Sequence, residues 1–364
     1  MDNIMQNRLD RAFYAYQKEY EAKALEVLRS GWYVLGKEVS SFEQEFAQYV
    51  QAKYCVGVGN GLDALWLSFR ILEIGKDDEV IVPSNTYIAS VMGITINGAT
   101  PVFVEPDEFF NINPEKIEEK ITSKTKAILV VHLYGQACQM KAIVDLCKKY
   151  HLRLVEDCAQ SHGAKCDGKI TGTFGDVGCF SFYPSKNLGA FGDAGAIVTD
   201  NEDIARKFTM YRNYGSEKRY YNKVVGANSR LDELQAGLLR VRLLHMKEIT
   251  AEREVIAKKY TNEIENNKIV KPSIAKDVTS VWHQYVVRCE ERERLLKLLI
   301  ENNIDAIIHY PIPPHLAEAY KYLGYHIGDF PIAERYSNTI LSLPIYSGMT
   351  ISEQTRVIDV LNRL

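Results

Sequence analysis

One lysine, Lys186, lies where its side chain could do chemistry. The apolar run 179–182 predicts a short buried strand, which leads into a turn of small residues that carries this lysine. A lysine amine held away from water has a lowered pKa, because burial disfavours its charged form. The neutral amine can then form an imine with a carbonyl group. A solvated loop lysine is the ordinary alternative, and for an isolated lysine it would be favoured.

A carboxylate stands at the end of a second predicted strand, upstream of the lysine. Residues 152–157 form an apolar run that ends at Asp157 and opens into a loop. A strand-end aspartate followed by a lysine in a small-residue turn indicates pyridoxal phosphate (PLP). In PLP chemistry the lysine holds the aldehyde, and the carboxylate keeps the pyridine nitrogen protonated. The sequence therefore predicts Lys186 as the catalytic residue and Asp157 as its cofactor-binding partner.

These segments resemble the DegT/DnrJ/EryC1/StrS family of sugar aminotransferases. The matching text is VEDCAQSHGA from Val155, GDVGCFSFYPSKNLGAFGDAGAIVTD from Gly175 and NSRLDELQAG from Asn228. The resemblance runs in the same order from about Ser30 to the C-terminus. It implies an α/β fold, that of a fold-type I PLP-dependent aminotransferase, with a large three-layer α/β domain and a smaller C-terminal α/β domain. We expect residues 1–244 to form the N-terminal segment and the large PLP-binding domain, and residues 245–364 the small one.

A strand at 54–58 followed by glycines and an apolar helix predicts an anion site. The free N–H groups and the positive dipole end of a helix N-terminus bind anions. The glycine spacing does not match the G-x-G-x-x-G dinucleotide loop, so a Rossmann cofactor site is set aside. In the resembled family this turn binds the PLP phosphate, commonly with Thr or Ser where this chain has Leu62. Here only the backbone donors of Gly61 and Leu62 would remain.

The resemblance assigns the other cofactor contacts. It implies that Ser181 binds the phosphate together with Asn228 of a neighbouring subunit, that Tyr87 stacks on the pyridine ring, and that Gln160 lies by the ring oxygen. A core tyrosine at a helix start is nearly as good an interpretation of Tyr87 from the sequence alone. His162 is near enough to share the pocket, although an isolated histidine is more often structural.

Strands alternate with helices through the first two thirds of the chain. The predicted strands are 54–58, 79–83, 101–104, 126–131, 152–157 and 179–182. One predicted helix ends near residue 28, and two others cover residues 39–49 and 140–150. This alternation predicts a largely parallel sheet covered on both faces, with the active site beyond the carboxyl ends of its strands.

The rest of the chain predicts a cap, a long helix and a smaller α/β unit. Ser229 and Asp232 fit a capping box for the helix that follows them. Further elements are expected as helices at 247–265, 292–302, 333–341 and 352–364, and as strands at 281–289 and 305–310.

Four residues are expected beside the substrate. The resemblance points to Tyr183 and to the loop with His309 and Tyr310, and Arg219 is a candidate clamp for a nucleotide diphosphate. A basic residue there is otherwise a solvated surface group. His309 and His315 could pair as metal ligands, but no third ligand lies at a plausible spacing, so we predict no metal site.

The resemblance implies a function as well as a fold. We expect an aminotransferase that moves an amino group from L-glutamate to C-3 of a dTDP-3-keto-6-deoxyhexose. The product, a dTDP-3-amino-3,6-dideoxyhexose, would serve a surface glycan such as lipopolysaccharide or an S-layer glycan. Some family members carry histidine in place of the lysine and are dehydratases, and Lys186 argues against that outcome. The alternatives are amination of a nucleotide-linked 4-keto sugar and a non-catalytic PLP or sugar-nucleotide sensor. The expected assembly is a homodimer with shared active sites.

Composition limits the partners. The chain has 364 residues and a formal net charge of −3, which gives no electrostatic reason to expect nucleic acid or an anionic membrane as a partner. Its seven cysteines are scattered without a C-x-x-C pair, as expected for reduced thiols. Residues 1–10 lack an apolar signal core, and no apolar run could span a bilayer. We therefore expect a cytoplasmic protein.

Overall fold

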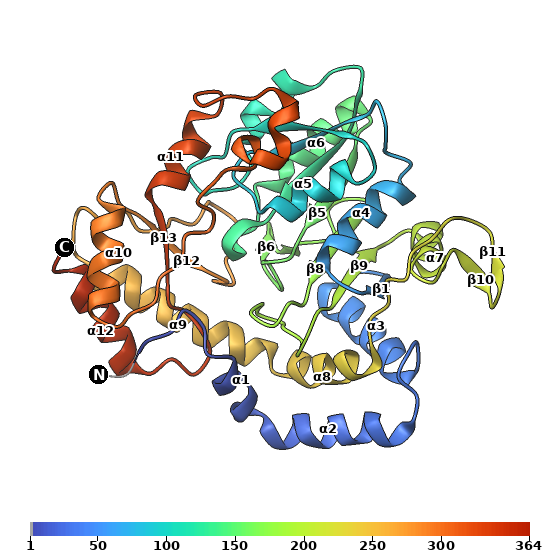
Figure 1. The fold of residues 1–364 in the computed structure, drawn as a ribbon, viewed down its shortest axis with the longest axis horizontal. Helices are drawn as coiled ribbons and strands as arrows, with labels where there is room; N and C mark the ends of the chain where they lie inside the picture. Colours follow the sequence, from blue (N-terminus) through green and yellow to red (C-terminus); the bar gives the residue numbers. More distant parts are fainter. Residues whose placement is uncertain (1–2) are drawn as a thin grey trace.

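A seven-stranded mixed sheet lies at the centre of the computed structural model, which describes residues 3–364 (Figure 1). Its strand order is β1-β9-β8-β5-β4-β2-β3. The strands from β8 to β3 run parallel, whereas β9 is antiparallel to both β1 and β8. The strands are β1 (Tyr54–Val58), β2 (Glu79–Pro83), β3 (Thr100–Val104), β4 (Thr125–Val131), β5 (Arg153–Asp157), β8 (Val177–Ser181) and β9 (Gly195–Thr199). The predicted, largely parallel sheet is confirmed.

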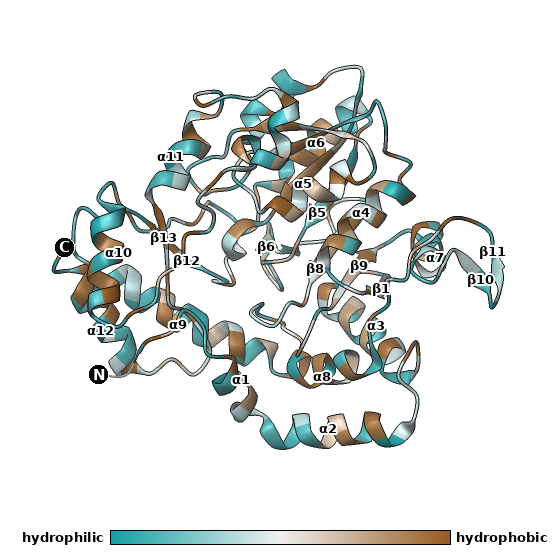
Figure 2. Cartoon of the chain, viewed as in Figure 1, coloured by the Kyte–Doolittle hydropathy of each residue, from teal (hydrophilic) through white to brown (hydrophobic). Residues whose placement is uncertain are grey.

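Helices cover both faces of this sheet. Successive strand residues point to opposite faces, so Leu129 of β4 packs with one set of helices and its neighbours Ile128 and Val130 pack on the opposite face. The helices of the first face are α4 (Gly61–Ile71), α5 (Ile88–Thr95) and α7 (Glu202–Tyr211), and those of the second are α3 (Lys37–Val50), α6 (Met140–Tyr150) and α8 (Glu233–Leu244). Figure 2 shows the apolar residues gathered on the central strands. The result is the expected three-layer arrangement.

A second, smaller core lies beside the sheet layers. Strands β12 (Tyr285–Arg288) and β13 (Ile340–Leu343) pair antiparallel. The helices of this part are α9 (Met246–Glu263), α10 (Arg292–Glu301), α11 (Pro331–Thr339) and α12 (Ile351–Leu361). Near the N-terminus, Ile4 is buried in the same core and forms a parallel bridge with Ile304. Met1 and Asp2, with which the expected first domain begins, lie outside the described residues.

Three local predictions are wrong. The helix expected up to residue 28 is broken at Tyr16 into α1 (Leu9–Ala15) and α2 (Gln17–Ser30), because Tyr16 leaves helical geometry at φ −129°. The expected strand 305–310 is reduced to an isolated bridge between Ile307 and Ser342, because the following residues turn into a cavity described below. The last part of the expected helix 333–341 is strand: α11 ends at Thr339 and Leu341 belongs to β13.

The predicted capping box is also wrong. Helix α8 begins at Glu233, and its N-cap residue Asp232 makes no side-chain capping bond. The Ser229 hydroxyl instead accepts a hydrogen bond from the Gly59 amide (3.0 Å) and donates one to Asp63 Oδ2 (2.6 Å). Ser229 therefore fastens the turn between β1 and α4 rather than its own helix.

A small hairpin projects from the sheet layers. Strands β10 (Ser216–Lys218) and β11 (Tyr221–Asn222) follow α7 and extend away from the rest of the chain (Figure 1). A second short pair, β6 (Lys165–Cys166) and β7 (Lys169–Ile170), lies after β5.

All seven cysteines are buried and free. Across residues 3–364, no helix combines the length and the apolar character that a bilayer crossing requires.

Candidate active site

A cavity of about 590 Å³ opens beyond the carboxyl ends of the parallel strands. Its walls come from the segments after β2, β4, β5 and β8, from the start of α4, and from the loop before β12 and the segment around residue 310. Ten of the residues predicted for the site line it, namely Gly61, Leu62, Tyr87, Asp157, Gln160, Ser181, Tyr183, Lys186, His309 and Tyr310. Asn228 and Arg219 do not. The site lies where a parallel α/β sheet is expected to bind its ligand.

Lys186 reaches the cavity from a tight turn after β8. Its backbone amide donates to the Tyr183 carbonyl (2.8 Å), which closes the turn. The side chain is half-buried, because one side faces the open cavity and protein surrounds the rest. Burial lowers the pKa of the amine to about 8, and the negative charge of Asp157 opposes part of that shift. About a tenth of the amine is therefore neutral at pH 7, far more than for free lysine, and the neutral amine is the form that makes an imine.

Asp157 ends β5 on the same cavity. Its side chain is 6% exposed; Oδ2 accepts from the Ser90 hydroxyl (2.7 Å) and Oδ1 from the Ala159 amide (3.1 Å). Burial raises the pKa of this carboxyl, and the two donors and the Lys186 charge work against the rise. A buried carboxylate held in this way suits a cationic partner, such as a protonated pyridine nitrogen.

The start of α4 forms a close cradle with the end of β8. Asn60 caps the helix, its side chain accepting from the Asp63 amide (2.8 Å), and the next two residues, Gly61 and Leu62, line the cavity. A Cβ atom on Gly61 would lie 2.6 Å from the Cβ of Ser181, so only glycine allows this approach. Backbone donors at a helix N-terminus beside a serine hydroxyl fit a phosphate group.

Gln160 and two tyrosines, Tyr87 and Tyr310, line another part of the cavity. Gln160 Oε1 accepts from the Tyr134 amide (2.6 Å), and its Nε2 donates to the Tyr310 hydroxyl (3.2 Å). The rings of Tyr87 and Tyr310 lie 5.0 Å apart at an angle of 34°. The Tyr134 hydroxyl donates to the His309 carbonyl. Gln160 thus links the loop after β5 to the segment that presents His309 and Tyr310.

The histidines divide between the cavity and the core. His162 lies between the rings of Phe180 and Phe182 and does not line the cavity; burial lowers its pKa to about 3. His309 and His315 have separate partners, since His309 Nδ1 lies 2.8 Å from Ser342 Oγ and His315 Nε2 lies 3.2 Å from Glu334 Oε1. The structure therefore supports the structural interpretation of His162 and does not bring His309 and His315 together.

One buried group could hold a metal by geometry alone. Ligand atoms of His132, Glu156 and Cys158 lie within 4.8 Å of one another. The Glu156 carboxylate already accepts from His132 Nε2 (3.1 Å) and from three backbone amides, those of Gly172, Phe174 and Gly175. His132 Nδ1 in turn accepts from the Cys138 amide. These bonds tie the loop after β7 to β5, which is a structural role.

Several cavity residues were not predicted from the sequence. Ser90, Gln284, His283 and Asp193 all line the cavity. Ser90 lies in α5, whose N-cap residue is Tyr87, but nothing in the sequence shows that its hydroxyl reaches Asp157. His283 and Gln284 belong to the expected strand 281–289, and no motif marks them.

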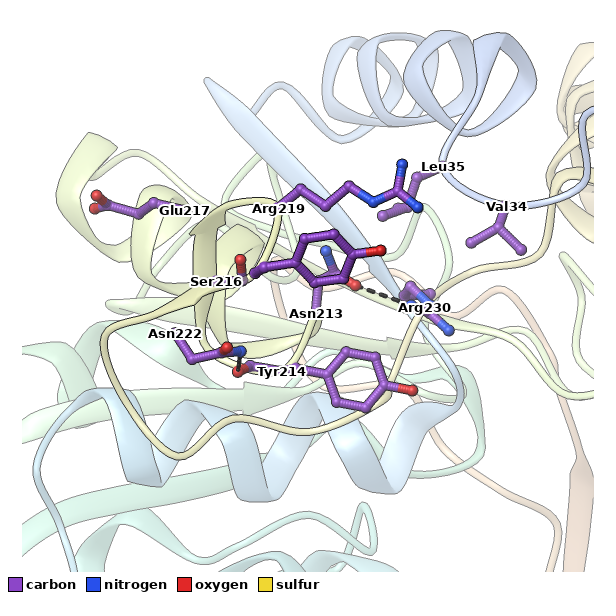
Figure 3. Close-up of a pocket in the computed structure, with 10 residues that line it drawn as sticks. Val34, Leu35, Asn213, Tyr214, Ser216, Glu217, Arg219, Asn222 and Arg230 are labelled. Atoms are coloured by element: carbon purple, nitrogen blue, oxygen red, sulfur yellow. Dashed lines mark hydrogen bonds between the residues drawn. The ribbon is translucent and has the colours of Figure 1, made fainter.

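A second cavity, of about 800 Å³, lies at the base of the projecting hairpin (Figure 3). Arg219 and Tyr220 line it from the hairpin, and Tyr214 and Arg230 from the segments on either side of it. Arg230 donates to Asn213 Oδ1 (2.9 Å), and its guanidinium lies over the Tyr214 ring at 5.4 Å. Tyr220 is 81% exposed.

The two residues missing from the first cavity belong to this region. Arg219 lines the second cavity, and Asn228 pairs with Asn213 in an antiparallel bridge and is exposed. Within one chain, neither contributes to the cavity that holds Lys186.

The chain is similar in sequence and in fold to known sugar aminotransferases. The chain is 53% identical over 349 residues to dTDP-3-amino-3,6-dideoxy-alpha-D-galactopyranose transaminase of Aneurinibacillus thermoaerophilus, with 96% of each chain covered. It superposes on the crystal structure of DesV of S. venezuelae in complex with a ketimine intermediate at a TM-score of 0.98, with 43% identity, 100% of this chain and 98% of that chain covered.

The PLP form of the putative sugar aminotransferase Spr1654 of Streptococcus pneumoniae also superposes, at a TM-score of 0.89 and 26% identity, over 95% of this chain and 95% of that one. The family model of the DegT/DnrJ/EryC1/StrS aminotransferases matches residues 15–362. The chain is therefore an aminotransferase with PLP as its cofactor, and it belongs to the DegT/DnrJ/EryC1/StrS family.

Proposed function

We propose that this protein transfers the amino group of L-glutamate to C-3 of a dTDP-3-keto-6-deoxyhexose, giving a dTDP-3-amino-3,6-dideoxyhexose. The observation that carries the proposal is the pairing of Lys186, whose amine has a pKa of about 8, with the buried carboxylate of Asp157 on one cavity. The choice of sugar draws on the relative from Aneurinibacillus thermoaerophilus, which is named for a dTDP-3-amino-3,6-dideoxyhexose.

The cavity residues fit the cofactor. Lys186 would hold it covalently, Asp157 would face its ring nitrogen, and the phosphate would meet the amides of Gly61 and Leu62 and the Ser181 hydroxyl. Tyr87 and Gln160 would contact the ring and its oxygen. When bound, PLP supplies an electron sink that accepts the electrons of the bond broken at the amino-bearing carbon.

Lys186 has a second task once the amino donor displaces it. Its amine would take the proton from the carbon that bears the amino group and deliver it on the cofactor side. A general base works best when its pKa lies near the working pH, and a pKa of about 8 meets that condition. Asp157, held by Ser90, would face the ring nitrogen of the cofactor and favour its protonated form.

The sugar nucleotide would lie at the mouth of the cavity, against Tyr183, His309 and Tyr310. Tyr183 is exposed there, whereas burial and the charge of Lys186 lower the pKa of His309 to about 4, so its imidazole is neutral. A neutral imidazole and phenol hydroxyls suit the uncharged hydroxyl groups of a hexose.

The remaining contacts would come from a second copy of the chain. We infer a homodimer in which the projecting hairpin reaches a neighbour's cavity, with Asn228 on the cofactor phosphate and Arg219 on the nucleotide diphosphate. The exposure of Asn228 and of Tyr220 beside Arg219 supports this placement, since both are free to meet a partner. We further propose the division at residues 1–244 and 245–364, a cytoplasmic location, and a product used for lipopolysaccharide or S-layer glycans.

The test follows the visible absorption of the PLP-loaded protein. L-Glutamate should abolish the band of the lysine-bound cofactor, and a dTDP-3-keto-6-deoxyhexose should restore it. A dTDP-4-keto sugar that restores it equally well would overturn the choice of C-3. A protein that binds PLP but never responds to any amino donor would favour the sensor over the enzyme. Lys186→Ala is the control, since it should lose the lysine-bound band and multiple turnover.

A further inference from the structure

Two buried hydroxyl groups form a chain that ends at the Asp157 carboxylate. The Ser90 hydroxyl donates to Asp157 Oδ2 (2.7 Å), and the Thr86 Oγ1 atom lies 2.8 Å from Ser90 Oγ. Thr86 precedes Tyr87, the N-cap residue of α5, and Ser90 lies in the first turn of that helix. Thr86 is 1% exposed and Ser90 is fully buried, and both line the cavity that holds Lys186.

Each hydroxyl has a single proton, which fixes the direction of this chain while Asp157 is ionised. An ionised carboxylate only accepts hydrogen bonds, so the Ser90 proton must lie between Ser90 and Asp157. The contact between the two hydroxyl groups can then be made only by the Thr86 proton, and Thr86 donates to Ser90. If Asp157 carried a proton on Oδ2 and donated it to Ser90, both hydroxyl groups would have to turn round.

Both oxygens of the carboxylate therefore face donors. Oδ1 accepts from the Ala159 amide (3.1 Å), and Oδ2 is reached by the two hydroxyl groups. Burial raises the pKa of Asp157, whereas the Ser90 and Ala159 bonds and the neighbouring Lys186 and His132 lower it. Three further titratable groups interact with Asp157, and burial raises the pKa of each, so they add no charge at neutral pH; they are Tyr310, Cys158 and Cys179.

We propose that Thr86 is a positioning residue for the cofactor: its hydroxyl donates to Ser90, and Ser90 thereby directs its only proton at Asp157 and favours the ionised carboxylate. A hydroxyl that accepts a hydrogen bond is a stronger donor, because hydrogen bonds in a chain polarise one another. The inference rests on the role proposed for Asp157 and adds a residue that acts on it through Ser90. No proton is transferred along the chain.

The sign of a pKa change separates this role from a packing role. Loss of a donor disfavours the charged form and raises the pKa of Asp157. Looser packing would admit water and lower that pKa towards its ordinary value, because burial is what raises it. Ser90→Ala removes a charged hydrogen bond and should raise the pKa by about one unit. Thr86→Val removes only the polarising hydroxyl and should raise it by about 0.3 unit.

The measurement is an infrared pH titration of the full-length protein, before PLP is added, with ¹³C in the aspartate side-chain carboxyl groups. The difference from Asp157→Asn assigns the Asp157 band. Thr86→Val keeps the shape of the side chain without its hydroxyl, and Thr86→Ser keeps the hydroxyl. Thr95→Val is the matched control, because it makes the same change at the other end of α5, where the Thr95 hydroxyl lies 3.1 Å from that of Tyr320.

The expected result is a raised pKa in Thr86→Val, the native value in Thr86→Ser and Thr95→Val, and the largest rise in Ser90→Ala. In the PLP-loaded protein, the acid pH at which PLP affinity falls should move upward in the same order, since a protonated Asp157 cannot pair with a cationic ring nitrogen. An unchanged or lowered pKa in Thr86→Val would overturn the proposal, as would a Thr86→Ser protein that behaves like Thr86→Val.

A double variant tests the route from Thr86 to Asp157. If Thr86 acts through Ser90, adding Thr86→Val to Ser90→Ala should change the pKa of Asp157 no further. Additive shifts would show that Thr86 acts without Ser90 and would contradict the proposed chain. Neither a sugar nor an amino donor takes part, so failure here is distinct from failure of the proposed amino transfer.

Discussion

Asp157 meets its two donors inside the protein before any ligand arrives. The Ser90 hydroxyl and the Ala159 amide orient the carboxylate, and burial raises its pKa. We expect Asp157→Asn to reduce kcat by about a hundredfold or more, because a neutral amide lacks the negative charge that favours a protonated ring nitrogen. Ser90→Ala should cost about tenfold, since one charged hydrogen bond is lost. Single-turnover rates with L-glutamate measure both.

The control for this pair is Asp145→Asn, which makes the same change on the exposed side of α6. It should leave the rate unchanged. Equal rates for Asp157→Asn and Ser90→Ala would contradict the ionic role of Asp157, since they would show that only its hydrogen bonding matters.

The lowered pKa of Lys186 predicts the pH dependence of cofactor capture. Only the neutral amine attacks the aldehyde. The pKa of about 8 lies below that of free lysine, so about half of the amine is neutral at pH 8, and the neutral fraction is nearly complete from about one unit above that pH. The rate of PLP uptake by the cofactor-free protein, followed by stopped-flow absorbance, should fall about tenfold per pH unit well below 8 and level off above it. A rate that keeps rising beyond about pH 10 would show a lysine with an ordinary pKa.

At the residue scale, the sequence identifies the groups that react but not those that orient them. Lys186 and Asp157 stand out because their types are unusual at the ends of apolar strands. Ser90 does not, because it acts through a contact with Asp157, a residue distant in the chain. Such contacts depend on packing, which no spacing rule expresses.

Among the elements, the start of α4 can approach β8 closely because Gly61 has no side chain. A methyl group on Gly61 would meet Ser181 Cβ at 2.6 Å, so Gly61→Ala must push α4 away from β8. Overpacking of this kind costs about 1–3 kcal/mol. We expect PLP affinity, measured by fluorescence titration, to fall by about tenfold or more. Leu62→Ala is the matched control: if this residue contributes only its amide, affinity should hardly change, and a comparable loss there would contradict the backbone-only role.

Helix α3 begins without a capping side chain of its own. Its N-cap residue is Gly36, and the Glu233 carboxylate of α8 accepts from three amides at the start of α3, those of Gly36 (2.6 Å), Glu38 (2.9 Å) and Val39 (2.9 Å). We expect Glu233→Ala to lower the free energy of unfolding by about 2–3 kcal/mol, since these buried donors lose a charged acceptor.

Denaturant unfolding measures this loss, and Glu45→Ala is the comparison. Glu45 also pairs across helices, with Arg240, but its side chain is 38% exposed. A surface ion pair is worth about 1 kcal/mol or less. If Glu45→Ala lowers the free energy of unfolding as much as Glu233→Ala does, the Glu233 cap stabilises the protein no more than a surface ion pair.

Element boundaries show where local patterns stop being informative. The strands of the sheet were predicted because an apolar run is needed on each buried strand whatever its neighbours are. The predicted capping box at Ser229 does not form, because the Ser229 hydroxyl is hydrogen-bonded to Gly59 and Asp63, which are distant in sequence. The expected strand at 305–310 does not form beyond the bridge between Ile307 and Ser342 of β13. After it, the side chains of His309 and Tyr310 contact the side chains of Ser342 and Gln160, and the backbone pairing does not continue.

On the scale of the whole molecule, the two cavities belong to different parts of the chain. One lies at the sheet's carboxyl edge with Lys186, and the other lies at the projecting hairpin with Arg219 (Figure 3). The hairpin presents exposed aromatic residues, Tyr220 and Tyr221, to solvent. Exposed aromatics of this kind mark binding surfaces. Only the family resemblance predicts that Lys186 and Arg219 act from different chains. No local sequence pattern indicates whether a loop contributes to the cavity of its own chain or of a second copy.

Mixing two inactive variants tests whether the hairpin serves a neighbour. Lys186→Ala removes the reacting amine, and Arg219→Ala removes the expected diphosphate contact. If Arg219 acts in the cavity of a second copy, a mixed dimer has one site that lacks both groups and one site that is intact.

Unfolding and refolding the two variants together in equal amounts should then recover about a quarter of the native turnover with the sugar nucleotide, because half of the dimers are mixed and each has one working site. If Arg219 acts in its own chain, every site lacks one group and mixing recovers nothing. Refolding each variant alone is the control, and the dimer itself is checked by light scattering.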